Sequence, residues 1–218
     1  MLKVASLRVT IKGFIILRNI SLDIPAGGLR ALVGRNGAGK TTTLKSIMGI
    51  MPVSGGSINL DGTDLLQVPG HRRAELGMGY MPEDRRLIGP LTVEDNILIP
   101  AWASRLENGT QRLAHIYDKM PEVAAMARRR ASTLSGGQQK MVALARAVMS
   151  GTKLLLLDEP FEGLSPAMGE KFARAILDMQ TDDLAILIAE SDTKRLNFVE
   201  KMYTIERGEI VEETASGG

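Results

Sequence analysis

Hydrophobic residues recur along this chain in two periods, and the period changes near the middle of the sequence. Residues 2–11 and 15–24 are rich in Val, Ile and Leu with partial alternation, and Lys12-Gly13 between them is typical of a hairpin turn. Later apolar runs are short and continuous, which is typical of strands buried in a parallel sheet. These expected strands are residues 29–33, 57–60, 78–81, 153–157, 184–189 and 202–205.

A helical period replaces the strand pattern after residue 91. We expect a helical insertion over about 91–150, in which 91–131 form a subdomain of their own. Trp102, Met120 and Met126 are expected to pack inside this subdomain, because long apolar side chains on short helices more often fill a core than bind a ligand.

Shorter helices are expected at 42–50 and 193–199. Strands that alternate with helices predict an α/β fold whose mostly parallel sheet is covered on both faces, preceded by an antiparallel N-terminal β subdomain. We expect residues 1–218 to form a single domain, with residues 215–218 frayed at its end.

The overall charge gives no direct clue to a partner. The chain has 27 basic and 25 acidic residues, so its net charge of +2 does not favour nucleic acid or an anionic membrane. The arginine clusters 72–73 and 128–130 are expected on a solvated face. The absence of cysteine excludes disulfides and thiolate metal sites. No apolar run approaches the roughly 18 residues that span a bilayer, and no signal peptide is visible, so we expect a soluble chain.

One stretch between an expected strand and an expected helix matches the phosphate-loop pattern G-x-x-x-x-G-K-[ST] without a mismatch. Its glycines allow successive backbone N–H groups to face phosphate oxygens, and the helix start adds partial positive charge. We expect the lysine to contact the β and γ phosphates of ATP and the threonine hydroxyl to bind Mg²⁺. The predicted nucleotide-binding residues here are Gly34, Arg35, Asn36, Gly37, Ala38, Gly39, Lys40, Thr41 and Thr42.

Two adjacent carboxylates follow the apolar run at 153–157. Ligands of open α/β sheets bind at the carboxyl ends of strands, where Asp158 and Glu159 stand. Asp158 suits coordination of Mg²⁺, and Glu159 suits activation of the attacking water as a general base. A simple helix cap is the alternative, but Pro160 and the upstream phosphate loop favour the catalytic interpretation.

A second phosphate-binding helix start is indicated by Leu134-Ser135-Gly136-Gly137-Gln138. Ser135 is expected to cap a helix over about 136–149, whose free N–H groups form an anion site. One chain therefore carries two such helix starts. If each nucleotide needs both of them, two chains can pair head to tail and each supply the half that the other lacks.

These residues resemble the ATP-binding subunit of an ABC transporter. The phosphate loop, the signature at 134–138 and the Asp158-Glu159 pair stand in that family's order and spacing, and the likeness covers essentially the whole chain. The turn at 162–166 and the segment at 82–86 are similar to the branched-chain amino acid uptake group. The resemblance implies an ABC ATPase cassette with a P-loop NTPase core. It also implies two ATPs sandwiched in a homodimer or heterodimer, each between one phosphate loop and the partner's Ser135, Gly136, Gly137 and Gln138.

Three positions depart from the family pattern. Ser191 stands where the family has a switch histidine; serine is shorter and not basic, so slow turnover is one expectation. Glu83 replaces a glutamine that senses Mg²⁺, and a carboxylate is an acceptable Mg²⁺ ligand. The adenine-stacking aromatic falls near Ile11, with Phe14 as the nearest aromatic, so we expect weaker ATP affinity and poorer discrimination against GTP.

The resulting hypothesis is an ATP-hydrolysing subunit of an uptake transporter for branched-chain or other amino acids or related small polar solutes. Lys40, Glu159 and Ser191 are its catalytic residues, and Thr41, Glu83 and Asp158 its metal ligands. The implied partners are integral membrane permease subunits, contacted through residues 83–91, and indirectly a periplasmic or extracellular solute-binding protein, but no nucleic acid. The chain would lie on the cytoplasmic face of the membrane.

Other functions are compatible with parts of the pattern. A nucleotide-dependent regulatory module with little hydrolysis is suggested by Ser191, although Glu159 argues against it. ATPases of the same class in DNA repair or translation carry coiled-coil insertions or twin cassettes, and neither pattern is visible here. The phosphate loop alone is compatible with a small-molecule kinase, but the signature at 134–138 argues against one.

Overall fold

The structure is a computed structural model that describes residues 1–104 and 106–215. The expected fraying of the end falls mainly on residues 216–218, which lie outside the described residues. Within them the strands are β1 (Leu2–Ile11), β2 (Phe14–Ile24), β3 (Leu29–Val33), β4 (Gly55–Leu60), β5 (Thr63–Asp64), β6 (Met78–Met81), β7 (Leu154–Asp158), β8 (Ala185–Glu190), β9 (Lys201–Glu206) and β10 (Glu209–Ala215).

These strands form one mixed sheet in the order β5-β4-β1-β2-β10-β9-β3-β8-β7-β6. The strands β9, β3, β8, β7 and β6 run parallel, whereas β1, β2, β4 and β5 pair antiparallel. The expected α/β fold with an antiparallel N-terminal part is confirmed. Among the described strands, β10 alone joins the two parts of the sheet: it pairs with β9 along its length but with β2 through the single parallel pair Glu209↔Asn19.

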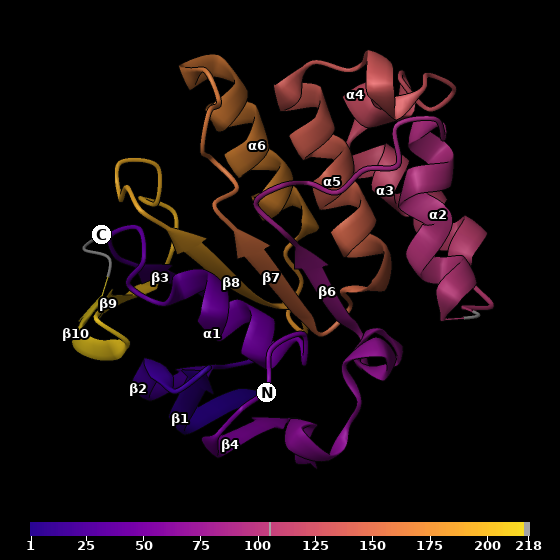
Figure 1. Cartoon of the computed structure of the whole chain (residues 1–218). Coiled ribbons are helices and arrows are strands. Elements are labelled where there is room, and N and C mark those ends of the chain that lie inside the picture. The colour runs from indigo at the N-terminus through magenta and orange to yellow at the C-terminus, as the bar shows by residue number, and fades with distance from the viewer. Residues whose placement is uncertain (105, 216–218) are drawn as a thin grey trace.

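Helices cover both faces of the parallel strands (Figure 1). They are α1 (Lys40–Ile47), α2 (Val93–Ala103), α3 (Gly109–Lys119), α4 (Pro121–Ala124), α5 (Gly136–Ser150) and α6 (Pro166–Met179), with 3-10 helices at Leu65–Gln67, Gly70–Leu76 and Ala131–Thr133. Helix α1 lies on the face toward β1 and β2, while α5 and α6 lie on the opposite face. Helices α2 to α4 gather on the far side of α5.

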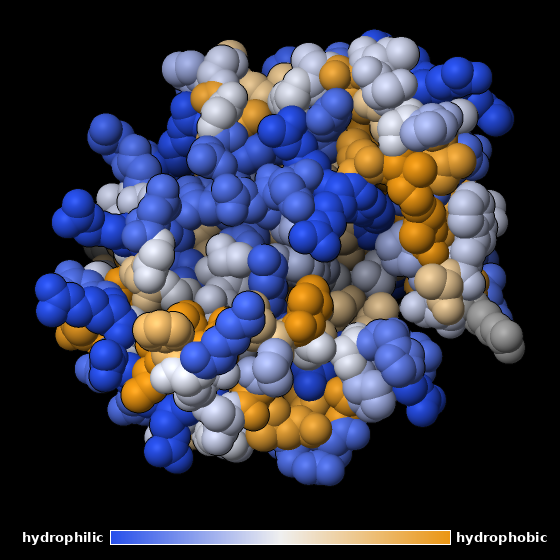
Figure 2. All heavy atoms as spheres, in the orientation of Figure 1, coloured by the Kyte–Doolittle hydropathy of each residue, from blue (hydrophilic) through white to orange (hydrophobic). Residues whose placement is uncertain are grey.

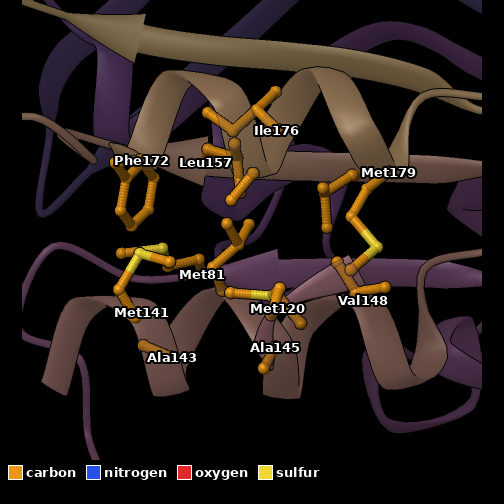
Figure 3. Close-up of a cluster of buried hydrophobic side chains, with 14 of the residues drawn as sticks. Met81, Met120, Met141, Ala143, Ala145, Val148, Leu157, Phe172, Ile176 and Met179 are labelled. Carbon is orange, nitrogen blue, oxygen red and sulfur yellow. The ribbon is translucent and has the colours of Figure 1, made fainter. Parts of the chain in front are cut away.

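Alternation along the parallel strands divides the core in two. Leu155 and Leu157 pack with α5 and α6, whereas Leu154 and Leu156 pack with α1 and the N-terminal strands. Strands that are apolar on both faces can only sit between two layers of helices or strands, which explains their uninterrupted leucine run. Figure 3 shows the first cluster, in which side chains of α6 face those of α5: Phe172, Ile176 and Met179 from α6 and Met141 and Val148 from α5.

The structure differs from the sequence expectations for Trp102 and for residues 193–199. Met120 and Met126 are buried as expected, but Trp102 is 56% exposed. Neighbouring positions of a helix point about 100° apart, and Ala101 takes the buried position beside it. Residues 193–199 form turns instead of a helix. Their apolar spacing comes from Leu196 and Val199, each buried at the end of a separate turn.

Arg73 also differs from the solvated position expected for it, since it is only 4% exposed. Its guanidinium donates to the carbonyls of Ser46 at 3.1 Å and Ile47 at 2.6 Å. The last carbonyls of a helix lack partners within the helix, and a cation there satisfies them and complements the helix dipole. Arg73 therefore caps α1, whereas Arg72 beside it is exposed.

Candidate active site

The phosphate loop connects the end of β3 to the start of α1, as the sequence predicts. Gly37 and Gly39 adopt positive φ of 81° and 118°, a region that other residues rarely enter. A Cβ on Gly34 would stand 2.3 Å from the Ile205 carbonyl oxygen. The loop is also hydrogen-bonded to its surroundings, because Gly34 N–H donates to the Glu190 carbonyl at 3.2 Å. Its curled shape is thus held by glycines and by the neighbouring strands.

A cavity of about 500 Å³ opens over this loop. Its lining includes residues predicted to bind nucleotide or to take part in catalysis: Asn36, Gly37, Gly39, Lys40, Thr41, Thr42, Glu83 and Glu159. Ile16 and Glu162 also line it, and the sequence did not single them out. Arg35 lies on the exposed outer side of the loop, and Ala38 is buried beneath it.

Lys40 is the central cation of the cavity although it is only 4% exposed. Its Nζ donates to the Gly34 carbonyl at 2.6 Å and to Ser191 Oγ at 3.0 Å, and it lies 3.0 Å from Glu159 Oε1. Lys40 is the first residue of α1, and these acceptors hold its ammonium group over the phosphate loop. The arrangement suits an anionic ligand.

Asp158 and Thr41 meet although they lie far apart in the sequence. Thr41 Oγ1 donates to Asp158 Oδ1 at 2.9 Å, and the Tyr80 hydroxyl donates to Asp158 Oδ2 at 3.0 Å. Burial raises the pKa of Asp158, and the two hydrogen bonds oppose that rise. Tyr80 was not predicted. It lies near the end of β6, which pairs with β7 in register, so the strand pairing brings it to the carboxylate.

Glu159 lies just beyond β7 with φ of 47°, which is uncommon for a residue other than glycine. Its carboxylate accepts from Ser191 Oγ at 2.6 Å and from Ser191 N–H at 3.2 Å. Burial alone would raise the pKa of Glu159, but the bonds from Ser191 and Glu190 and the Lys40 ammonium bring it below the usual range. Glu159 is therefore held as an anion that faces the phosphate loop.

Two further titratable groups behind Glu159 were missed by the sequence analysis. Glu190 is 4% exposed, and its Oε1 accepts from Phe161 N–H at 2.7 Å. Burial raises the pKa of Glu190 to about 8. Lys140 is buried and donates to the Glu159 carbonyl at 2.7 Å. Both residues come from elements distant in sequence from Glu159. Their contacts can be predicted only when the packing of β8 and α5 beside β7 is known.

The oxygen ligands around the cavity fit Mg²⁺. Thr41 and Asp158 are in contact, and Glu83 also lines the cavity. The pKa of Glu83 is raised by partial burial and by the nearby charges of Glu162, Asp158 and Glu159. A divalent cation would relieve this repulsion. Over residues 1–104 and 106–215 no three His, Cys, Asp or Glu side chains are grouped to hold a metal alone.

The side of the cavity formed by the N-terminal strands is aliphatic. Ile16 of β2 lines it, whereas Ile11 and Phe14 are not among the described lining residues. Ile11 packs against the core of the N-terminal strands, and Phe14 is 74% exposed. Phe14, the nearest aromatic, therefore does not stand where it could stack on a base in this cavity.

The second helix start has the predicted cap but faces elsewhere. Ser135 Oγ accepts from Gln138 N–H at 3.3 Å, and Gln138 Oε1 accepts from Ser135 N–H at 3.0 Å. This reciprocal capping box leaves Ser135 and Gly136 exposed. Within the described residues, none of the four from 135 to 138 lines the cavity over the phosphate loop. The structure does not bring the two helix starts of one chain together.

None of the described helices is both long enough and apolar enough to cross a membrane.

Comparison with known proteins places these features in context. The model of the ABC transporter family matches residues 17–162. A probable branched-chain amino acid transport ATP-binding protein, LivF of Archaeoglobus fulgidus, is 36% identical over 96% of this chain and 90% of its own length. The lipopolysaccharide export system ATP-binding protein LptB of Escherichia coli is 32% identical over 92% of this chain and 84% of its own. A dimeric ATP-binding cassette solved with ADP and Pi has a TM-score of 0.88 at 23% identity, with 100% of both chains covered, which shows the shared fold.

Proposed function

The chain belongs to the ABC transporter family as one of its ATP-hydrolysing cassettes, and on that premise we propose that it drives the uptake of branched-chain or other amino acids or related small polar solutes. Cassettes of this family dimerise and pair with permease subunits. The name of the LivF relative and the segments at 82–86 and 162–166 support amino acid uptake as the transported class.

The observation that carries the proposed chemistry is the convergence of Lys40, Thr41 and Glu159 on one cavity, with Asp158 bonded to Thr41. Backbone N–H groups of the phosphate loop and the Lys40 ammonium bind the β and γ phosphates. Glu159 orients the water that attacks the γ-phosphorus and accepts its proton, because its lowered pKa keeps it ionised at neutral pH. Ser191 holds the Glu159 carboxylate toward the loop and substitutes for the family's histidine.

We assign the Mg²⁺ ligands to Thr41 and Asp158, with Glu83 near the open side of the cavity. When bound, Mg²⁺ neutralises charge on the β and γ phosphates. The residues themselves arrange the ligand oxygens, since the Tyr80 hydroxyl holds one Asp158 oxygen and Thr41 holds the other.

The position of the second helix start supports a composite site made by two chains. Ser135 and Gly137 belong to a capped helix start that is not part of the described lining of its own chain's cavity. An exposed helix N-terminus is suited to an anion, and a head-to-tail pair would place it on the partner's nucleotide. The partner is either a second copy of this chain or a different ATPase subunit.

A groove beside α2 is our candidate for the permease contact. A cavity of about 500 Å³ there is lined by Met48, Ile50, His71, Pro100 and Arg146, among others. Figure 2 shows hydrophobic side chains gathered over α2, and Ile50, Ile88 and Trp102 are about half exposed. An apolar patch with a basic rim suits a segment of a membrane subunit. This docking places the chain on the cytoplasmic face of the membrane, with any solute-binding protein contacted only indirectly.

The segment 83–91, which we propose as a further contact with the membrane subunit, carries Arg85 and Arg86. Arg86 is exposed and pairs with Asp84 of its own chain, so it remains accessible to a permease. Arg85 is turned toward α5 instead.

Hydrolysis is tested by measuring phosphate release from Mg-ATP over a range of chain concentrations, with Glu159→Gln as the blank. A rate per chain that rises with concentration and vanishes in the variant supports a composite site with Glu159 as base. A rate per chain that is independent of concentration contradicts the composite site.

The transported class is tested by reconstituting the cassette with its permease subunits in liposomes. ATP-dependent entry of labelled leucine, isoleucine or valine, absent with Glu159→Gln, is the expected result. Because LptB is similar to a comparable degree, lipopolysaccharide extraction by the same vesicles is the matched alternative assay. Extraction without amino acid entry would reject the uptake proposal and leave the ATPase assignment intact.

A further inference from the structure

We propose that Arg85 couples the nucleotide cavity of its own chain to the first turn of α5, so that the two composite sites of a dimer respond to each other. The inference rests on the composite dimer proposed above. It makes Arg85 a positioning residue, because its side chain acts through α5 and not on the nucleotide.

The segment from Pro82 to Arg86 begins at the cavity. It follows β6 directly, and Glu83 lines the cavity. Arg85 N–H donates to the Pro82 carbonyl at 3.0 Å, which closes a tight turn with Glu83 inside it. Arg85 and Arg86 both have positive φ, 60° and 47°. Two consecutive residues of this kind are unfavourable in isolation and persist only where the surroundings hold them.

Helix α5 supplies what holds the turn. The Arg146 guanidinium donates to the carbonyl of Arg86 at 2.7 Å and also to the carbonyl of Arg85. Arg146 lies in the middle of α5, whose neighbouring residues are buried. The backbone of the turn is therefore attached to the body of this helix, and the two move together.

The side chain of Arg85 reaches the other end of the same helix. Its Nη1 donates to Gln139 Oε1 at 3.1 Å and lies 3.4 Å from the Gly136 carbonyl oxygen. Gln139 Nε2 in turn donates to the Leu134 carbonyl at 3.3 Å, directly before Ser135. The approach is close, because a Cβ at position 136 would stand 3.3 Å from Nη1. A continuous chain of hydrogen bonds thus runs from the turn to the cap of α5.

This geometry links two sites that serve different nucleotides. Glu83 faces the nucleotide of its own chain, while Ser135 is offered to the nucleotide of the partner. A displacement of Glu83 on binding is transmitted through Arg85 and Gln139 to the cap. By linkage, occupancy of one site then changes affinity at the other, for which typical coupling is roughly 5- to 150-fold. The device predicts positive cooperativity between the two ATPs.

The test measures phosphate release against Mg-ATP concentration for the full chain and for Arg85→Ala. Arg86→Ala is the matched control, since this neighbour also has positive φ and is exposed, but its side chain pairs only with Asp84 in the described structure. Binding of ATP to each variant in a Glu159→Gln background at low chain concentration reports the single half-site. Arg85→Lys, which keeps one charged donor, and Gln139→Met, which removes the acceptor, probe the link itself.

We expect a Hill coefficient above 1 for the unmodified chain and for Arg86→Ala, and a coefficient near 1 for Arg85→Ala and Gln139→Met. The half-saturating ATP concentration should rise by about tenfold, the usual effect of losing one charged hydrogen bond, while binding to the single half-site stays unchanged. Arg85→Lys should keep part of the cooperativity. The double variant Arg85→Ala/Gln139→Met should have the same Hill coefficient as either single variant, because both remove the same link.

A Hill coefficient of 1 in the unmodified chain, or an Arg85→Ala variant equal to Arg86→Ala, would overturn the coupling while leaving the proposed function in place. A rate per chain that does not rise with chain concentration would instead overturn the dimer, and the coupling with it.

Discussion

The two helix starts of this chain use the same physics and stand in opposite surroundings. At the start of α1, Lys40 is buried, and it is bonded to Ser191 and paired with Glu159. At the start of α5, Ser135 is exposed and bonded within its own capping box. The first region gathers charges from α1, β7 and β8, while the second presents the dipole and free N–H groups of its helix beside the Arg85 guanidinium.

The difference shows how one chain divides a catalytic site. The α1 start contains the groups that bind phosphate and activate water, which need fixed distances among charged atoms. The α5 start instead offers backbone N–H groups at a capped helix end, and its exposed surface is open to another molecule. A site assembled from two chains requires both features: buried, preorganised groups at the α1 start and an accessible cap at the α5 start.

Glu159→Gln should break the α1 side most strongly. An amide cannot accept the proton from water, so we expect turnover to fall by about 10²- to 10⁴-fold. Binding of Mg-ATP should persist, because Lys40 and the loop remain. Glu162→Gln is the control: this residue lines the same cavity, and its loss should cost less than tenfold. A Glu162 variant as inactive as the Glu159 variant would shift the role of base away from Glu159.

Ser135→Ala should break the α5 side without affecting the first. We expect turnover to fall by roughly 10- to 100-fold, the effect of removing one or two hydrogen bonds to a charged group. ATP binding to a single chain should be unchanged. Thr92→Ala provides the control, since Thr92 and Asp95 form the same capping box on α2. Both variants should lose about 1 kcal/mol of folding stability. An equal loss of turnover in both would mean that Ser135 only caps α5 and does not contact the nucleotide.

Glu190→Gln should change the pH dependence of stability on the α1 side, because Glu190 is buried there and has a raised pKa. The Glu190 pKa is about 8 in the folded chain against 4.5 as the ordinary value. Between these values the folded chain holds a proton that the unfolded chain has released. Stability therefore falls as pH rises from about 4.5 to about 8, and the penalty is complete above that range.

The Gln side chain retains an acceptor for Phe161 N–H but does not titrate. Melting temperatures should be similar for the two proteins near about pH 5 and should favour the variant by a few degrees near about pH 9, at roughly 2–4 °C per kcal/mol. Glu162→Gln, at an exposed position, should show no such pH-dependent gap. A constant gap between wild type and Glu190→Gln would argue against a raised pKa.

Ile16→Ala should have the smallest effect. Removing an aliphatic contact of a few methylenes weakens nucleotide binding by about tenfold or less. Because an aliphatic wall makes no hydrogen bond to the base, ATP and GTP should lose affinity equally. Phe14→Ala, at a position outside the described lining, should change neither affinity. A selective loss of ATP binding would show that Ile16 reads the base.

Much of the α1 side was predictable from sequence, because the phosphate-loop motif determines its own backbone. The strand at 29–33, the loop and the contact of Thr41 with Asp158 follow from one pattern and from the rule that strand ends meet. The Ser135 cap was also predictable, because capping is local. Tyr80, Lys140 and Glu190 were not, since their contacts depend on strand register and helix packing across long separations.

Errors arose where local apolar spacing had another cause. Residues 193–199 repeat Leu196 and Val199 at a helical interval, yet both are buried by separate turns. Helix α6 and strand β10 were not predicted at all. β10 carries Glu209, Glu212 and Glu213 and is largely exposed, so its strand character comes from pairing with β9 and not from an apolar pattern.

The narrow junction between the two parts of the sheet has a mechanical consequence. Glu209↔Asn19 is the only ladder pair between β10 and β2 in the described chain, and Gly208 adds bonds from Arg18 N–H at 2.8 Å and Asn19 N–H at 3.3 Å. Ile16 lies on one side of this seam and Lys40 on the other. A nucleotide that contacts both residues connects the two parts of the sheet. Nucleotide binding should therefore slow backbone amide hydrogen exchange most at residues 16–19 and 208–209.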